Sequence, residues 1–346
     1  MTDIHIRRDG RAGRITLNRP KALNALTWDM CLEIERALDT WRDDPAIHLL
    51  LIDGTGDRAF CAGGDIAEMY AAGQRGDHDY GRRFWADEYR MNAKLFHFPK
   101  PVATFLHGFT MGGGVGVGCH ASHRIVDDSA RIAMPECGIG LIPDVGGSLI
   151  LARAPGRLGE FLGTTGHRMD AADAIHAGFA DYHIPDDWNA LKTTLCETGD
   201  TATIDAAATE PPPSQLAADQ AQIDRLFAGE TLADIARALA PETTPLAETA
   251  KKALAKNAPL STACAVEILH RLGDDPTIEQ ALGMEYRFTH RASEQADFIE
   301  GIRAQIIDKD RNPTWRHPNP QSVPLGDVSA MLRPLGPDAL NLETPQ

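Results

Sequence analysis

The chain has 346 residues, of which 43% are hydrophobic and 24% are charged, a balance typical of a globular protein with one or two sizeable cores. Its formal net charge of −15 excludes a general nucleic-acid binder, which needs a basic face, but leaves room for a local basic pocket that holds an anionic ligand. Six cysteines without a C-x-x-C pair predict reduced, buried thiols and a cytoplasmic location, and no secretory signal is visible.

The first half of the chain alternates short apolar runs with helical patterns. Residues 4–7 and 14–17 flank Asp9-Gly10 and predict a β-hairpin. Thr27 is the expected N-cap of a helix, because apolar residues recur at helical spacing after it. Further strands are expected at residues 48–52, 101–106, 124–126 and 131–133, and further helices at 66–70, 81–96, 113–120, 146–153 and 171–177. Strands separated by helices indicate an α/β fold.

The composition changes after residue 185. Residues 196–215 are rich in Thr, Ala and Asp and contain three consecutive prolines, so they are predicted to be a linker or an exposed loop. Residues 216–312 have helical patterns, with a capping box that begins at Thr277 and an apolar stripe formed by Phe298, Ile302 and Ile306. Seven prolines between Pro313 and Pro345 predict a tail, residues 313–346, without regular structure. We detect no internal repeat.

Residues 101–123 contain no charged side chain and six glycines. The glycines and three histidines make membrane insertion unfavourable, so no membrane contact is expected. A backbone with so few polar side chains around it typically recognises ligands through its own N–H groups. A helix that begins near Gly113 would direct its first N–H groups outward as an oxyanion site. Two alternatives stay open, namely a dinucleotide-binding fingerprint at residues 116–121 and a purely structural glycine bend.

A second glycine turn, in residues 58–66, follows a predicted strand and exposes the N–H group of Gly64. Two N–H groups from separate loops, those of Gly64 and Gly113, form a candidate oxyanion hole. The loss of one such donor typically lowers the rate by ~10²–10³.

Two carboxylates, Glu136 and Asp144, stand in the otherwise uncharged residues 134–147. Each has a simple explanation as a solvated carboxylate, and Asp144 is also a candidate cap for the helix that follows. Burial would instead raise the pKa of each carboxyl group and prepare it for proton transfer or attack. The histidines lack metal-binding spacing and there is no G-x-S-x-G motif, so neither a metal site nor a serine hydrolase is expected.

Together these loops resemble the crotonase, or enoyl-CoA hydratase/isomerase, superfamily. The segments that carry the resemblance are residues 18–26, 59–65 and 107–114. Within the superfamily, the pattern Met-Pro-Glu136…Ile-Pro-Asp144-Val-Gly-Gly is similar to that of the 3-hydroxyisobutyryl-CoA hydrolases, as are residues 284–287 and 307–313. Hydratases carry a glutamate where this chain has Gly116, and a small residue where it has Asp144.

The resemblance implies a crotonase-like α/β fold, a spiral of ββα turns followed by a helical C-terminal region. Residues 1–195 would be the acyl-CoA-binding catalytic core, 196–215 the linker, 216–312 the helical region and 313–346 the proline-rich tail. Gly64 and Gly113 match the two oxyanion-hole positions, Glu136 is the implied nucleophile or base, Asp144 its partner, and Glu88 a further substrate-site acid. The backbone implied to surround the adenine comes from two segments, with Lys21, Ala22 and Leu23 in one and Ala62, Gly63, Asp65 and Ile66 in the other. The candidate cations for the nucleotide phosphates are Arg19, Lys21 and Arg58.

These features predict a thioester hydrolase that acts on a short branched 3-hydroxyacyl-CoA, most simply 3-hydroxyisobutyryl-CoA in valine degradation. One alternative is an enoyl-CoA hydratase or isomerase that uses Glu136 alone. An alternative of another class is a CoA-binding protein without turnover, and an NAD oxidoreductase is a further one. No cofactor is expected beyond the coenzyme A of the substrate, no nucleic-acid partner is expected, and a homo-oligomer is possible.

Overall fold

The computed structural model describes residues 2–273 and 275–343. They divide into two compact units, each assembled from three separate segments. The sheet unit takes residues up to Gly64, Arg90–Ala133 and Arg168–Ala217. The helical unit takes Asp65–Tyr89, Met134–His167 and the residues from Ala218 onward. Neither unit is therefore one continuous stretch of sequence.

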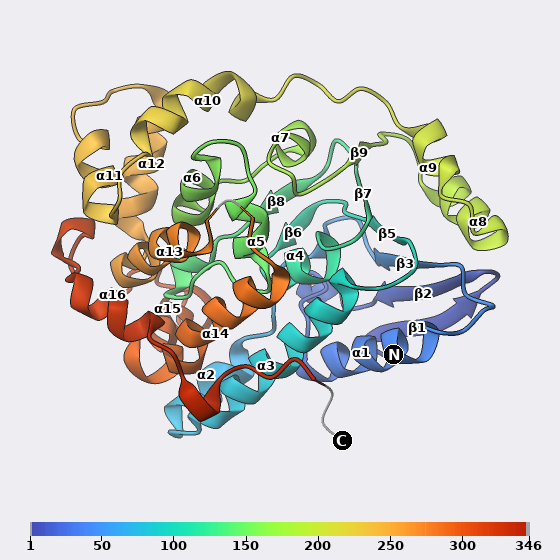
Figure 1. Ribbon diagram of the computed structural model, residues 1–346, viewed down its shortest axis with the longest axis horizontal. Coiled ribbons are helices and arrows are strands. Elements are labelled where there is room, and N and C mark those ends of the chain that lie inside the picture. The colour runs from blue at the N-terminus through green and yellow to red at the C-terminus, as the bar shows by residue number, and fades with distance from the viewer. Residues whose placement is uncertain (1, 274, 344–346) are drawn as a thin grey trace. The chain divides into compact units, whose positions relative to one another are not determined.

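The sheet unit contains a six-stranded sheet of order β1-β2-β3-β5-β7-β9 and a three-stranded parallel sheet of order β4-β6-β8 (Figure 1). Each turn of the chain supplies one strand to each sheet, in the pairs β3 and β4, β5 and β6, β7 and β8. This is the spiral expected from the resemblance. The strands are β1 (Ile4–Asp9), β2 (Ala12–Leu17), β3 (Leu49–Gly54), β4 (Ala59–Cys61), β5 (Val102–Phe105), β6 (Phe109–Met111), β7 (His123–Val126), β8 (Arg131–Ala133) and β9 (Tyr182–His183).

Local signals in the sequence account for the first elements. The predicted hairpin is confirmed, with β1 antiparallel to β2 and Gly10 at a φ of +58°, a left-handed conformation that glycine adopts without strain. Thr27 caps α1 (Trp28–Trp41) by accepting a hydrogen bond from the Met30 N–H. The remaining helices of this unit are α4 (Gly113–Gly118), α7 (Ala171–His176), α8 (Asn189–Thr198) and α9 (Ala202–Ala207), and α3 (His78–Phe96) passes into it after Tyr89.

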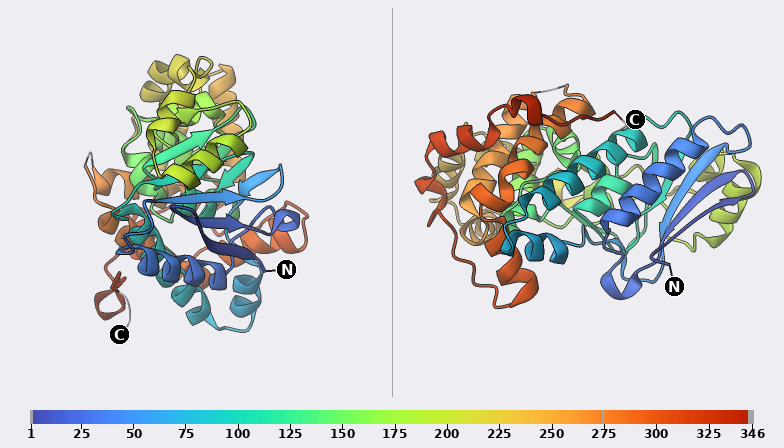
Figure 2. Two further views of the ribbon diagram at one scale, coloured as in Figure 1. Left: turned by 90° about the vertical axis from the view of Figure 1, so that its right-hand side faces the viewer. Right: turned by 90° about the horizontal axis from the view of Figure 1, so that it is seen from below.

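Both faces of the six-stranded sheet are covered, α1 on one and α8 with α9 on the other (Figures 1 and 2). Alternate residues of a strand point to opposite faces. Leu49 and Leu51 accordingly share a core with Trp188 and Leu195, whereas a Cβ at Gly13 would meet Trp41 of α1 at 2.4 Å. The mainly parallel sheet is thus buried on both sides, which explains the continuous apolar run in β3.

The helical unit is built around α13 (Pro259–Leu272), which packs against helices from three parts of the chain and buries most of its side chains (Figure 1). Its neighbours include α5, α6, α14 and α16. The other helices with residues in this unit are α2 (Ala67–Gln74), α3 as far as Tyr89, α5 (Gly147–Ala152), α6 (Leu158–Thr165), α10 (Gln215–Leu226), α11 (Leu232–Leu239), α12 (Pro245–Lys256), α14 (Ile278–Gln295), α15 (Phe298–Ile302) and α16 (Leu325–Leu332). The capping box predicted at the start of α14 is present.

Three expectations differ from the structure. Ile306 does not continue the buried stripe of Phe298 and Ile302, because the helix widens into a π-turn at Arg303–Ile307 and leaves Ile306 41% exposed. The predicted linker contains α9. The tail was expected to lack regular structure, but α16 forms between Pro324 and Pro334, where nine residues free of proline allow a helix of eight residues.

No helix within residues 2–273 and 275–343 has the length and apolar character needed to cross a lipid bilayer.

The tail helix should contribute measurably to stability. Leu332 is fully buried where α16 packs against α13 and α14, whereas Leu325 of the same helix is 66% exposed. We expect Leu332→Ala to lower the free energy of unfolding by about 2–5 kcal/mol and the matched Leu325→Ala to change it by less than about 0.5 kcal/mol. Urea denaturation followed by circular dichroism measures both, and equal effects would show that α16 does not pack as described.

Candidate active site

The two predicted oxyanion donors lie at one edge of the small sheet. β4 and β6 are parallel neighbours with Cys61 opposite Thr110, so their carboxyl ends point the same way. The chain leaving β4 reaches Gly64, and the chain leaving β6 reaches Gly113, the first residue of α4. Neither N–H group donates to an acceptor among the described residues. Both donors are therefore available to a ligand atom.

Glycine is required where α4 meets β4. A Cβ at Gly114 would lie 2.2 Å from the Cys61 carbonyl oxygen, and Gly112 has a φ of +50°. The glycine bend is thus structural as well as a source of N–H groups. The dinucleotide alternative is wrong, because Gly116 and Gly118 lie inside buried α4 rather than in a turn between strand and helix.

The predicted coenzyme-binding backbone segments of this unit lie side by side. The Ala62 N–H donates to the Leu23 oxygen at 3.0 Å, and the Leu26 N–H donates to the Gly63 oxygen at 2.9 Å. Asn24, which is fully buried, fixes the loop by donating to the Thr55 and Ala59 oxygens. The structure therefore brings Lys21, Ala22 and Leu23 together with Ala62, Gly63 and Gly64.

The candidate phosphate-binding cations differ in exposure and in the contacts that they already make within the chain. Lys21 and Arg58 are exposed. Arg19 is less free, because its guanidinium donates to the Ala25 oxygen at 2.6 Å and pairs with Asp3 at 3.3 Å. Asp65 and Ile66, also predicted to bind the coenzyme, belong to the helical unit, where Ile66 is the N-cap residue of α2.

Glu136 opens a short 3₁₀ turn, Glu136–Ile139, in the helical unit. Backbone contacts hold this turn in place, since Cys137 accepts a hydrogen bond from the Ala258 N–H at 2.8 Å and a Cβ at Gly301 would meet the Ile139 oxygen at 2.1 Å. The Glu136 side chain is 5% exposed, and its Oε2 atom is buried without a hydrogen-bond partner among the described residues. Burial first, and then the charges of Asp144 and Glu285, raise the pKa of Glu136 well above its usual value.

Asp144 is also buried, at 4% exposure, so the hypothesis of solvated carboxylates is wrong for both residues. The Tyr89 hydroxyl donates to Asp144 Oδ2 at 2.7 Å. Burial raises the pKa of Asp144 to about 7, although the Tyr89 hydrogen bond opposes this shift. The next residue, Val145, has a φ of +55°, a strained conformation for a β-branched side chain.

Glu285 of α14 holds the turn that carries Asp144. Its carboxylate accepts hydrogen bonds from the Gly146 N–H at 2.8 Å and the Ser148 N–H at 3.0 Å, and from the Ser148 hydroxyl. It therefore caps α5, a role for which Asp144 was one candidate from the sequence. Burial raises the pKa of Glu285 to about 8, with the charge of Asp144 adding to the shift. The hydrogen bonds explain how the turn keeps Val145 in its strained conformation.

Glu88 completes a group of four buried carboxyl residues. It is 3% exposed, and burial followed by the charge of Asp144 raises its pKa well above the usual value. None of the four pairs with a cation in the part of the chain that the structure describes. The same part holds no cluster of His, Cys, Asp or Glu side chains arranged to bind a metal ion. A carboxyl group with a pKa of about 7, such as that of Asp144, takes up and releases protons near neutral pH.

Sequence analysis did not identify Tyr89 and Glu285 as functional residues. Glu285 was part of a segment that carried the resemblance, but nothing in its spacing indicated a partner 137 to 139 residues away. Tyr89 follows Glu88 directly, and an isolated tyrosine in a helical pattern is usually explained by core packing.

Comparisons with known proteins show the family to which the chain belongs. A family model for enoyl-CoA hydratase/isomerase matches residues 12–332. The mitochondrial 3-hydroxyisobutyryl-CoA hydrolase of Gallus gallus is 33% identical over 98% of this chain and 91% of its own length, and that of Mus musculus is 35% identical over 96% and 89%.

Two solved structures share the whole fold. A crystal structure described as an enoyl-CoA hydratase from Rhodobacter sphaeroides 2.4.1 has a TM-score of 0.95 at 55% identity, covering 98% of this chain and 100% of the other. One described as a carnitinyl-CoA dehydratase from Mycobacterium thermoresistibile has a TM-score of 0.93 at 39% identity, covering 99% of both. The fold is therefore crotonase-like, and the chain belongs to the enoyl-CoA hydratase/isomerase family.

Proposed function

We propose that this protein hydrolyses the thioester of a short branched 3-hydroxyacyl-CoA, and that its substrate is 3-hydroxyisobutyryl-CoA. The observation that carries the proposal is the buried Glu136 carboxyl group. One of its oxygens has no hydrogen-bond partner among the described residues, and burial together with the charge of Asp144 raises its pKa. The relatives named 3-hydroxyisobutyryl-CoA hydrolase, which match nearly the whole chain, support the choice of substrate.

The reaction uses groups of the chain alone. The N–H groups of Gly64 and Gly113 hold the thioester oxygen while it gains negative charge. The ionised Glu136 attacks the carbonyl carbon, the C–S bond breaks, and the coenzyme leaves as a thiolate that takes a proton from solvent. Water then cleaves the resulting anhydride to release the acid and regenerate Glu136. In the alternative route Glu136 takes a proton from a water molecule, which attacks the same carbon and gives the same products.

The other buried groups support Glu136. Asp144 keeps the pKa of Glu136 high and recognises the substrate hydroxyl group together with Glu88. Glu285 acts as a positioning residue through the turn at Gly146 and Ser148. Lys21 and Arg58 bind the nucleotide phosphates, and the backbone of residues 21–23 and 62–66 surrounds the adenine.

The proposal includes no cofactor besides the coenzyme A of the substrate. We assign the enzyme to valine degradation in the cytoplasm, a reducing compartment that suits six buried cysteines that form no disulfide. The relatives are named as mitochondrial proteins. Cell fractionation with an antibody distinguishes the two locations, and sedimentation analysis tests the predicted homo-oligomer.

Release of free thiol tests the proposed function. Purified protein should release coenzyme A from 3-hydroxyisobutyryl-CoA, measured with a thiol reagent. The second candidate is an enoyl-CoA hydratase, favoured by the description of the structure that is 55% identical. Gly116 has no side chain to activate water, so hydration of crotonyl-CoA, followed by loss of enoyl absorbance, should be slow or absent. Rapid hydration without thiol release would overturn the hydrolase proposal in favour of the hydratase.

Replacement of Glu136 should abolish turnover. Glu136→Gln keeps the size of the side chain but removes the nucleophile and base, so kcat should fall by several orders of magnitude while CoA binding persists. The matched control is Glu33→Gln on the exposed face of α1, which should leave kcat unchanged. Thiol release and calorimetric titration with CoA provide the two measurements. Turnover close to that of the parent protein would remove Glu136 from the mechanism.

The charge of Asp144 should determine where activity begins on the pH scale. Burial raises the pKa of Glu136 and the charge of Asp144 adds to this shift, so removing that charge favours the ionised form of Glu136. Asp144→Asn should therefore move the acidic limb of the profile of kcat/KM against pH to lower pH, even as it lowers the maximum. Single-turnover thiol release gives the profile if turnover is slow. The exposed Asp43→Asn serves as control. An acidic limb that stays in place or moves upward would contradict the coupling.

A further inference from the structure

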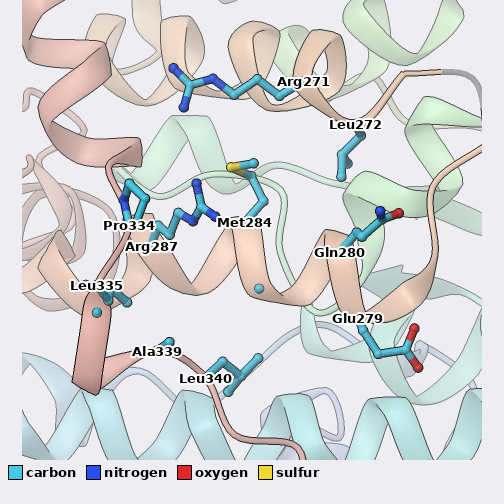
Figure 3. Close-up of a pocket in the computed structure, with 12 residues that line it drawn as sticks. Arg271, Leu272, Glu279, Gln280, Met284, Arg287, Pro334, Leu335, Ala339 and Leu340 are labelled. Atoms are coloured by element: carbon cyan, nitrogen blue, oxygen red, sulfur yellow. The ribbon is translucent and has the colours of Figure 1, made fainter.

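A cavity of about 520 Å³ lies in the helical unit between α13, α14 and the chain after α16 (Figure 3). Its walls combine apolar side chains with two arginines, Arg271 of α13 and Arg287 of α14. The apolar part consists chiefly of Leu272, Met284, Leu335 and Leu340. Small-molecule sites in proteins typically have volumes of about 300–1,000 Å³ and this kind of lining.

The cavity is separate from the buried carboxyl groups. Glu88, Glu136, Asp144 and Glu285 do not line it. α14 separates the two features, because Glu285 on one face binds the start of α5 while Met284 and Arg287 on the other face line the cavity. The cavity therefore needs an explanation of its own.

Positive charge gathers at one end of the cavity. Arg271 and Arg287 each donate to the Leu332 oxygen, at 3.4 and 3.2 Å, and Arg291 donates to the Met331 and Arg333 oxygens. Arg271 pairs with Glu267 at 2.7 Å, but no carboxylate pairs with Arg287 or Arg291 in residues 2–273 and 275–343. Burial, followed by the charges of Arg333 and Arg287, lowers the pKa of Arg291.

The carbonyl oxygens at the carboxyl end of α16 accept hydrogen bonds from only some of the guanidinium N–H groups of these arginines. A guanidinium carries five N–H donors, and Arg287 gives one of them to a carbonyl oxygen. Glu279 also lines the cavity, but its carboxylate points away from both arginines in Figure 3. In a protein with a net charge of −15, two neighbouring arginines, Arg287 and Arg291, that no carboxylate of the described residues neutralises indicate an anionic partner.

We propose that this cavity binds a small organic anion whose charged end, a carboxylate or a phosphate, meets Arg287 and Arg271 and whose apolar remainder lies against Met284, Leu335 and Leu340. The guanidinium fork matches either oxyanion. The apolar walls exclude inorganic phosphate as the complete ligand, because it would leave them in contact with water.

Isothermal titration calorimetry tests the proposal with octanoate and octyl phosphate as probes. Coenzyme A is kept in excess so that the proposed active site is occupied. One equivalent of at least one probe should bind, and the stronger of the two identifies the oxyanion. Octanamide, which lacks the charge, and inorganic phosphate, which lacks the chain, should bind at least about tenfold more weakly. Failure of both charged probes to bind would overturn the proposal.

Two variants locate the binding. Arg287→Met keeps an apolar stem but removes the charge, and should weaken binding about tenfold or more. Gly283 lines the cavity and a Cβ there would meet nothing within 4 Å, so Gly283→Phe should fill the cavity without disturbing the helix and abolish binding.

The matched control is Arg36→Met on the exposed face of α1, which should bind as the parent protein does. Thermal unfolding confirms that each variant is folded, and Gly283→Phe leaves every arginine in place if Arg287→Met is unstable. Unchanged affinity in Gly283→Phe would place the probe elsewhere and overturn the proposal.

Discussion

Four carboxyl groups are buried together and none of them pairs with a cation among the described residues 2–273 and 275–343, a constraint that shapes the helical unit. A buried charge is costly unless hydrogen bonds or counter-ions compensate for it. The structure compensates two of the four, Asp144 through the Tyr89 hydroxyl and Glu285 through the N–H groups at the start of α5. Burial first, and then the charge of Asp144, raise the pKa of the other two, Glu88 and Glu136. One oxygen of Glu136 is buried without a hydrogen-bond partner among the described residues.

The burial of these carboxyl groups also links the capping of α5 to the position of Asp144. Capping of α5 by Glu285, far along the chain, leaves Asp144 free to face Tyr89. It also fixes a turn in which Val145 has a left-handed conformation. Strain of this kind persists only where surrounding contacts overdetermine the backbone. α14 therefore contributes to the site by positioning this turn rather than through direct chemistry, and its residues Met284 and Arg287 line the separate cavity.

Turns and helix caps formed by residues close in the sequence could be predicted from it, whereas contacts between residues far apart in the sequence could not. The hairpin at Gly10, the cap at Thr27 and the box at Thr277 depend on residues within a few positions, so the sequence indicated them. Gly64 and Gly113 were predicted as donors because glycine turns after parallel strands expose N–H groups. Glu285 and Tyr89 were missed, because their partners are 137 to 139 and 55 residues away. The tail helix was not predicted, because the number of prolines in the tail was considered without their spacing. The residues between Pro324 and Pro334 contain no proline and form α16.

The interleaving of the two units has a consequence for synthesis on the ribosome. The sheet unit, with Gly64 and Gly113, has its full sequence once Ala217 has been made. The helical unit has to wait for α14 to supply Glu285 and for α16 to cover α13. A nascent chain therefore holds the backbone donors before its carboxyl groups can be buried, and domains that are complete early generally fold first. Chains that end after α13 but before α16 would expose the apolar surface of α13, which makes them targets for chaperones.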